Sequence, residues 1–218
     1  MTRPPLSPIA TPRVLAVILL CAAALVAAAG SAGALEEGAG EGKAIDACDQ
    51  RLCTILQRRD LKGDDLKCAL TKTWARSTLK EADQRDVKWD FGDARCTVQI
   101  NISRAALVSA LSAGEAKFWV PAHTAHCVVE QDGQVKTVTA TVAPKIVFRD
   151  GKAEKIWINL MNVDGPAGIR TTLSTAASLN DSIGLFHRAM LKSVNGYIYK
   201  HCPKYYPLTA AKAAPKAK

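Results

Sequence analysis

The sequence HTAHC, residues 123–127, places two histidines and a cysteine within five positions, and imidazole and thiolate groups are ligands of transition metals. These residues belong to a run of alternating apolar and polar side chains, which predicts a β-strand. Successive side chains of a strand point to opposite faces, so His123 and His126 cannot bind one ion unless the strand is bulged. We therefore expect no metal site here, and ordinary strand packing or a disulfide for Cys127.

A second alternating run follows across Asp132-Gly133, and Asp-Gly between two such runs favours a hairpin with a two-residue turn. This turn pairs residue 127 with 138, 125 with 140 and 123 with 142. One face of the predicted hairpin is then mostly apolar, with His123, Ala125, Cys127, Val138, Ala140 and Val142. The other face is rich in threonine hydroxyl groups.

Two further dipeptides predict hairpins. For Asp150-Gly151 we expect a three-residue loop, because a two-residue loop would place Ile146 and Ile156 on opposite faces. Gly92-Asp93 is interpreted as a two-residue turn that pairs Trp89 with Cys96.

Two segments beside these hairpins have their own signals. Ser103 is a typical N-cap residue, and it predicts a short helix that ends near Gly114. The segment 66–74 fits a strand through its alternating residues and fits a helix nearly as well. Pro144 cannot donate to a strand ladder, so it must interrupt the long run between the hairpins.

Six cysteines follow residue 34, and their even number in an exported chain predicts disulfide bonds. They are Cys48, Cys53, Cys68, Cys96, Cys127 and Cys202. No C-x-x-C sequence occurs, so neither a paired-thiolate zinc site nor a thioredoxin-type redox pair is expected. Cys48 and Cys53 are about 140° apart on a predicted helix, so each should join the helix to another element. Of the fifteen possible pairings, one candidate set is Cys53–Cys68, Cys48–Cys202 and Cys96–Cys127.

The first 34 residues have the order of a secretory signal peptide: the basic residues Arg3 and Arg13, an apolar run over 14–29, and small residues up to Ala34. Cleavage near Ala34 predicts an exported chain, periplasmic or secreted. The alternatives are an uncleaved membrane anchor and a lipoprotein attached at Cys21. Loss of the two arginines lowers the formal net charge from +9 to +7.

The clearest helical pattern covers residues 179–201, where apolar residues recur every three or four positions. They are Leu179, Ile183, Phe186, Met190, Val194 and Tyr197, followed by His201. This predicts one long helix, which begins near Asn180 or earlier, near Ile169. After Pro207 the chain is basic and rich in alanine and proline, which is typical of a disordered tail.

These elements predict an α+β fold with a single domain: a twisted antiparallel meander covered by a long C-terminal helix, with an N-terminal helix tied on by disulfides. The predicted organisation is a signal peptide at 1–34, a flexible lead at 35–43, the globular domain at 44–203 and the basic tail at 204–218.

The sequence contains no local motif for a hydrolase, a nucleotide or a cofactor, so no catalytic residue or cofactor is predicted. The function expected first is a non-enzymatic binding or interaction domain of the cell envelope. Its partner would be an anionic envelope component contacted by Lys204, Lys212, Lys216 and Lys218, and no nucleic acid is expected. Asn101 and Asn180 each begin an N-x-S sequence.

Two alternatives remain open. The first is a carrier of an apolar, lipid-like ligand, with a groove between the sheet and the C-terminal helix. Its expected lining residues are Phe186, Met190, Val194, Ile156, Ile158, Val138 and Ala140. The second is a hydrolase whose site is assembled in space from residues that are distant in sequence.

Overall fold

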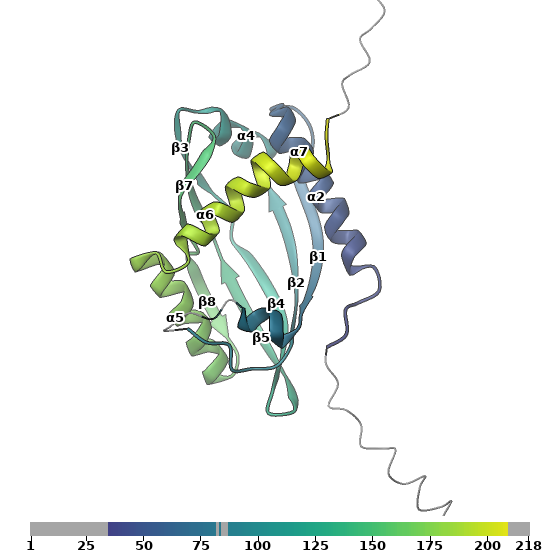
Figure 1. Ribbon diagram of the computed structural model, residues 1–218, viewed down its shortest axis with the longest axis vertical. Helices are drawn as coiled ribbons and strands as arrows, with labels where there is room; N and C mark the ends of the chain where they lie inside the picture. Colours follow the sequence, from purple (N-terminus) through teal and green to yellow (C-terminus); the bar gives the residue numbers. More distant parts are fainter. Residues whose placement is uncertain (1–34, 82, 84–86, 209–218) are drawn as a thin grey trace, which may run out of the picture. The chain divides into compact units, whose positions relative to one another are not determined.

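A computed structural model describes residues 35–81, 83 and 87–208, which form an α+β fold with antiparallel sheets (Figure 1). The predicted signal peptide and the part of the tail after residue 208 lie outside the described residues. The helices are α2 (Glu41–Arg58), α3 (Arg76–Lys80), α4 (Arg104–Ser112), α5 (Ala167–Ile183), α6 (His187–Gly196), the π-helix η1 (Tyr197–His201) and α7 (Cys202–Tyr205). The strands are β1 (Leu66–Trp74), β2 (Ala94–Ile102), β3 (Glu115–Trp119), β4 (His123–Gln131), β5 (Gln134–Val142), β6 (Lys145–Arg149), β7 (Lys152–Trp157) and β8 (Leu160–Asp164).

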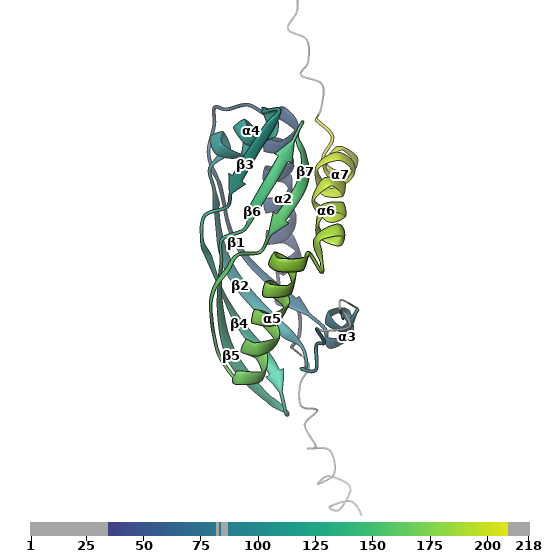
Figure 2. The same cartoon turned by 90° about the vertical axis from the view of Figure 1, so that its left-hand side faces the viewer.

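The strands form two sheets rather than one meander. Five strands pair in the order β1-β2-β4-β5-β8, and three pair in the order β3-β6-β7. Helices α2, α5 and α6 lie on one side of the strands (Figure 2), where they pack on β1, β8 and β7 respectively. Within these described residues, no helix is both long enough and apolar enough to cross a membrane.

The hairpin of β4 and β5 has the predicted register. His123 pairs with Val142, Ala125 with Ala140, and Gln131 with Gln134 across the two-residue turn. Asp132 and Gly133 have φ angles of 53° and 70°. Two positive φ angles belong to the turn type whose twist matches that of the flanking strands, which explains the preference for Asp-Gly.

The hairpin of β6 and β7 corrects the prediction of a three-residue loop. Arg149 pairs with Lys152, so the loop is the two residues Asp150 and Gly151. The register shifts between Val147 and Phe148, which is a β-bulge on β7. The bulge, rather than a longer loop, brings the apolar residues of the two strands to one face.

The turn predicted at Gly92-Asp93 is wrong. Strand β2 pairs with β1, from Trp74 opposite Ala94 to Leu66 opposite Ile102. The ambiguous segment 66–74 is therefore a strand, and the connection after it includes α3. The Asp93 carboxylate accepts hydrogen bonds from the backbone N–H groups of Arg76 and Leu35, so this acid ends the connection instead of turning a hairpin.

The single long C-terminal helix is also corrected. Helix α5 ends at Ile183, and Gly184 follows with a φ of 70°, a left-handed conformation that favours glycine and ends helices. Helix α6 begins at His187 and continues directly into η1 and α7. The short helix predicted after Ser103 is confirmed as α4, and the Ser103 hydroxyl accepts a hydrogen bond from the N–H of Ala106.

All six cysteines that follow residue 34 form disulfides. Cys48–Cys68 joins α2 to β1, Cys53–Cys202 joins α2 to α7, and Cys96–Cys127 joins β2 to β4. The third pair was predicted correctly, whereas the partners of Cys48 and Cys53 are exchanged. The two cysteines do face different elements, but sequence periodicity alone does not say which side of α2 faces the sheet.

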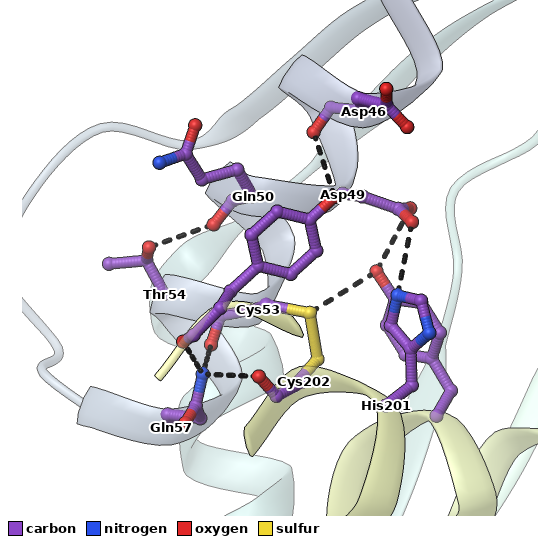
Figure 3. The surroundings of a disulfide bond; sticks show 10 residues. Asp46, Asp49, Gln50, Cys53, Thr54, Gln57, His201 and Cys202 are labelled. Atoms are coloured by element: carbon purple, nitrogen blue, oxygen red, sulfur yellow. Dashed lines mark hydrogen bonds and ion pairs between the residues drawn. A yellow bond between two sulfur atoms is a disulfide. The ribbon is translucent and has the colours of Figure 1, made fainter. Parts of the chain in front are cut away.

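The Cys53–Cys202 bond has a polar neighbour that reinforces it. The side-chain amide nitrogen of Gln57 lies within hydrogen-bond distance of three backbone oxygens, those of Cys53 (3.3 Å), Cys202 (3.4 Å) and Tyr206 (2.9 Å) (Figure 3). One side chain of α2 thus holds the end of the described chain in place.

Apolar side chains form two buried clusters. The larger lies between α2, α4, the three-stranded sheet and the C-terminal helices. The smaller lies under α5 and consists of Ala94, Val129, Val138 and Ile169, with partly buried neighbours around them. Helix α5 therefore covers one region of the strands, and α2, α4 and the C-terminal helices cover another.

Glu41 is a buried acid at the start of α2, inside the segment 35–43 that was predicted to be a flexible lead. Its carboxylate accepts hydrogen bonds from the N–H and hydroxyl groups of Thr73, and from the N–H of Gly38. The Lys72 ammonium lies 3.6 Å away. Burial raises the pKa of Glu41, but these hydrogen bonds and the positive charge outweigh burial and hold the pKa below its usual value.

We expect Glu41→Gln to lower the free energy of unfolding at pH 7 by about 1–3 kcal/mol, because hydrogen bonds to a buried carboxylate are lost. A carboxyl with a lowered pKa in the folded state stabilises the protein above its unfolded pKa, about 4.3, and that stabilisation is lost as the pH falls through the folded value. Denaturant unfolding at several pH values tests this, with the exposed Glu37→Gln as the control. A difference between wild type and Glu41→Gln that is the same at pH 7 and pH 3 would contradict it.

The three disulfides should differ in what they contribute. Cys53–Cys202 spans 149 residues, Cys96–Cys127 spans 31 and Cys48–Cys68 spans 20. Loop-closure entropy then predicts losses of about 5, 4 and 3 kcal/mol on replacing each pair with serine. Denaturant unfolding of the three double-serine variants measures the order. The expectation fails if the Cys53/Cys202 variant is the most stable of the three.

Candidate functional site

A pocket of about 370 Å³ with almost wholly apolar walls opens on the surface of the larger cluster. Segments far apart in the sequence build it: α2, the end of β2, α4, β3, β6, α6 and η1. Its lining residues are Leu52, Leu56, Ile102, Leu107, Phe118, Val120, Ile146, Phe148, Ser193, Val194, Tyr197 and Ile198. This volume is within the range of small-molecule sites, about 300–1,000 Å³.

Local periodicity explains which side chains reach the pocket. Leu52 and Leu56 are four residues apart, so they lie on one face of α2. In the three-stranded sheet, Phe118 of β3 lies directly opposite Ile146 of β6, and side chains alternate along both strands. The floor is deeply buried, with Phe118 and Phe148 at 5% and 2% exposure. The upper walls, including Val194 and Tyr197, are only partly buried.

The polar group of Tyr197 is turned away from the pocket. Its hydroxyl donates a 3.0 Å hydrogen bond to the carboxylate of Asp49 on α2. Burial, followed by the charge of Asp49, raises the pKa of Tyr197 well above its usual value, so the hydroxyl keeps its proton. The aromatic ring therefore faces the pocket as an apolar surface, while its polar end ties η1 to α2.

The residues predicted to line a groove are divided between the two clusters. Val194 lines the pocket, Ile156 is buried in the same cluster, and Met190 is partly buried against it. Val138 belongs instead to the smaller cluster under α5, and its strand neighbour Ala140 is partly buried opposite Ala125.

The last two residues predicted to line the groove lie in connections, one between α5 and α6 and one between β7 and β8. Phe186 precedes the first residue of α6, and the N–H of Ile158 donates a hydrogen bond to Asp181.

The remaining lining residues could be found only in part from the sequence. Leu52 belongs to the apolar periodicity of the N-terminal helix, and Leu56 continues it. Phe118, Val120 and Ile146 have no local signal that connects them, because they meet only when β3 pairs with β6.

The two histidines of HTAHC have different surroundings. His126 is exposed, whereas His123 is buried at 8% exposure. The pairing of β2 with β4 ends where Val98 lies opposite Ala125. Beyond this point, the Nε2 atom of His123 accepts a 2.9 Å hydrogen bond from the backbone N–H of Asn101. His123 thus replaces a missing backbone acceptor. Among the residues that the structure describes, no three His, Cys, Asp or Glu side chains are grouped to hold a metal ion.

The other two histidines lie on the C-terminal helices. His201 stacks on Tyr197 with ring centroids 5.0 Å apart, and its Nε2 is 3.4 Å from the carboxylate of Asp49 (Figure 3). His187 at the start of α6 contacts the backbone oxygen of Glu154 through Nε2, at 3.2 Å. The His187 contact joins α6 to β7, whereas the His201 Nε2 makes no hydrogen bond to any residue that the structure describes.

We expect His123→Ala to lower the free energy of unfolding by about 1–3 kcal/mol, because the N–H of Asn101 loses its acceptor in a partly buried position. His126→Ala on the same strand should change it by less than about 0.5 kcal/mol. Thermal or denaturant unfolding of both variants measures the difference. Equal effects would show that His123 has no special role.

No protein-family model, curated protein or solved structure matches this chain. The apolar pocket, its position between α2 and the helices α6 and η1, and its almost wholly apolar lining are therefore the observations from which a function has to be inferred.

Proposed function

We propose that the protein binds a small apolar ligand, or the hydrocarbon part of an amphipathic one, in the pocket between α2, η1 and the three-stranded sheet. The observation that carries the proposal is the pocket itself, about 370 Å³ with walls of Leu, Ile, Val and Phe side chains. The pocket opens to solvent on one side, so its apolar walls are in contact with water. An apolar ligand would remove these walls from water, which is favourable by about 25 cal/mol for each Å² of apolar area buried.

The ligand should have no polar group at its inner end. Tyr197 is engaged with Asp49, and the only other polar side chain in the lining is that of Ser193, which is exposed. Inside the pocket a polar group would lose its hydrogen bonds to water without replacement. The polar end of an amphipathic ligand would remain at the partly exposed wall formed by α6.

We also propose that this binding takes place outside the cytoplasm, after removal of residues 1–34 near Ala34. Three disulfides support this, since such bonds persist in oxidising compartments. The folded domain would then begin close to Leu35 and continue past residue 203, because α7 ends at Tyr205. No catalytic role is part of this proposal.

The apolar pocket favours the ligand-binding interpretation over a purely interacting scaffold, for which a closed core is expected. A basic tail remains as a second contact surface. Of its four lysines, Lys204 is exposed on α7, and Lys212, Lys216 and Lys218 lie outside the described residues. We propose contact of this tail with an anionic envelope component only as an accessory to binding in the pocket.

Filling the pocket should abolish binding without unfolding the protein. Val194→Trp places a large side chain in the pocket, whereas Val135→Trp places the same side chain on an exposed hairpin end. Titration with a fluorescent polyunsaturated fatty acid should give saturable binding to wild type and Val135→Trp, and at least about tenfold weaker binding to Val194→Trp.

Melting temperatures of both variants control for folding, and native mass spectrometry of the exported protein reports a ligand that copurifies. The proposal fails if wild type does not bind the fatty acid, or if the two tryptophan variants bind it equally well.

A further inference from the structure

A second hollow lies on the three-stranded sheet, on the face opposite the apolar pocket. Phe118 and Ile146 point into the pocket, so the next residues, Trp119 and Lys145, point to the other face. Lys145 lies directly opposite Trp119 on β3 and Trp157 on β7. Helix α6 packs on β7 (Figure 2), and the C-terminal end of α5 borders the hollow through Asp181.

The three side chains form an ordered stack. The Lys145 ammonium is 4.7 Å from the ring centroid of Trp119 and 4.7 Å from that of Trp157. Attraction between the cation and the two indole faces holds the ammonium in place. Among the described residues, no carboxylate lies within 4.0 Å of this ammonium, so its hydrogen-bond donors are available to a ligand.

Acceptors and an aromatic surface complete the hollow. It has a volume of about 200 Å³ and is lined by Trp119, Lys145, Trp157, Asn159 and Asp181. The Asp181 carboxylate accepts hydrogen bonds from the N–H groups of Ile158 (2.7 Å) and Asn159 (2.8 Å), which fixes the loop after β7. Trp119 is 58% exposed, so part of its indole is accessible to a ligand.

We propose that this hollow binds one pyranose ring of a carbohydrate. The apolar C–H face of a sugar ring with equatorial hydroxyl groups stacks on an exposed indole, while its hydroxyl groups need donors and acceptors at the ring edge. Trp119 supplies the first, and the Lys145 ammonium supplies donors. The Asn159 amide nitrogen already donates to the oxygen of Ala143, and Asp181 already accepts three hydrogen bonds, so these two side chains supply only their remaining acceptor lone pairs. At about 200 Å³ the hollow is smaller than most small-molecule sites, about 300–1,000 Å³, so it has room for one ring and not for a larger ligand.

The free ammonium of Lys145 also suits a sugar that carries a carboxylate. Two β-1,4-linked disaccharides separate the cases: chitobiose, which is neutral, and the disaccharide of N-acetylglucosamine and N-acetylmuramic acid, which carries a lactyl carboxylate. Titration of the disulfide-bonded protein, followed by tryptophan fluorescence, measures both affinities. Tighter binding of the second disaccharide indicates an acidic ligand, and equal binding indicates a neutral one.

The key variant is Trp119→Ala, which should weaken the binding of either disaccharide by about tenfold or more. Tyr205→Ala is a matched control, because Tyr205 is also 58% exposed and has Lys204 over its ring at 4.8 Å, but it lines no part of the hollow. Lys145→Gln should remove any preference for the carboxylate, and Val194→Trp in the apolar pocket should leave sugar binding unchanged.

Melting temperatures establish that each variant is folded. The proposal is overturned if wild type binds neither disaccharide, or if Trp119→Ala binds them as tightly as Tyr205→Ala does. Failure of fatty acid binding in the other pocket would leave this result unaffected.

Discussion

The bond between Cys53 and Cys202 is the constraint on which the rest of the structure depends. Both residues are at 0% exposure, and the bond joins the first described helix to the last. Two residues close to Cys53 on α2, and two residues of η1, which precedes Cys202, line the apolar pocket: Leu52, Leu56, Tyr197 and Ile198. The covalent link that closes the chain therefore also fixes the distance between two walls of the pocket, which strand pairing alone does not set.

The π-helix explains how the C-terminal helix serves both the pocket and the disulfide. In an α-helix, residues four apart are separated by about 400° of rotation about the helix axis. Each such residue therefore points about 40° further around the helix than the one before it. Met190, Val194, Ile198 and Cys202 have this spacing, yet all four pack into the larger cluster. The N–H of Cys202 donates a hydrogen bond to the backbone oxygen of Tyr197, five residues earlier. This wider turn offsets the extra rotation, so that the four side chains stay on one side of the helix. π-turns of this kind often occur at functional sites.

What the sequence predicted well depends on interactions between near neighbours. The hairpin around Asp132-Gly133, the helix capped by Ser103 and the helical character of residues 187–201 follow from turn chemistry, capping and periodicity. The errors concern partners that are distant in sequence. Periodicity cannot distinguish the two possible partners of Cys48, and it passed over Gly184, where a left-handed φ divides the predicted helix. The predicted apolar groove shares Val194 with the pocket but none of the other lining residues, because the pocket walls meet only after strands of both sheets and the helices α2, α4, α6 and η1 are in place.

The β-bulge in the three-stranded sheet determines which side chains face each of the two candidate sites. With a regular ladder after the two-residue turn, Ile146 would lie opposite Lys155, and Lys145 would lie opposite Ile156. The bulge shifts the register by one residue, so that Ile146 pairs with Ile156 and Lys145 with Trp157. A one-residue slip exchanges the two faces of a strand. The bulge thus completes an apolar inner face for the pocket and, on the outer face, brings the second tryptophan beside the lysine.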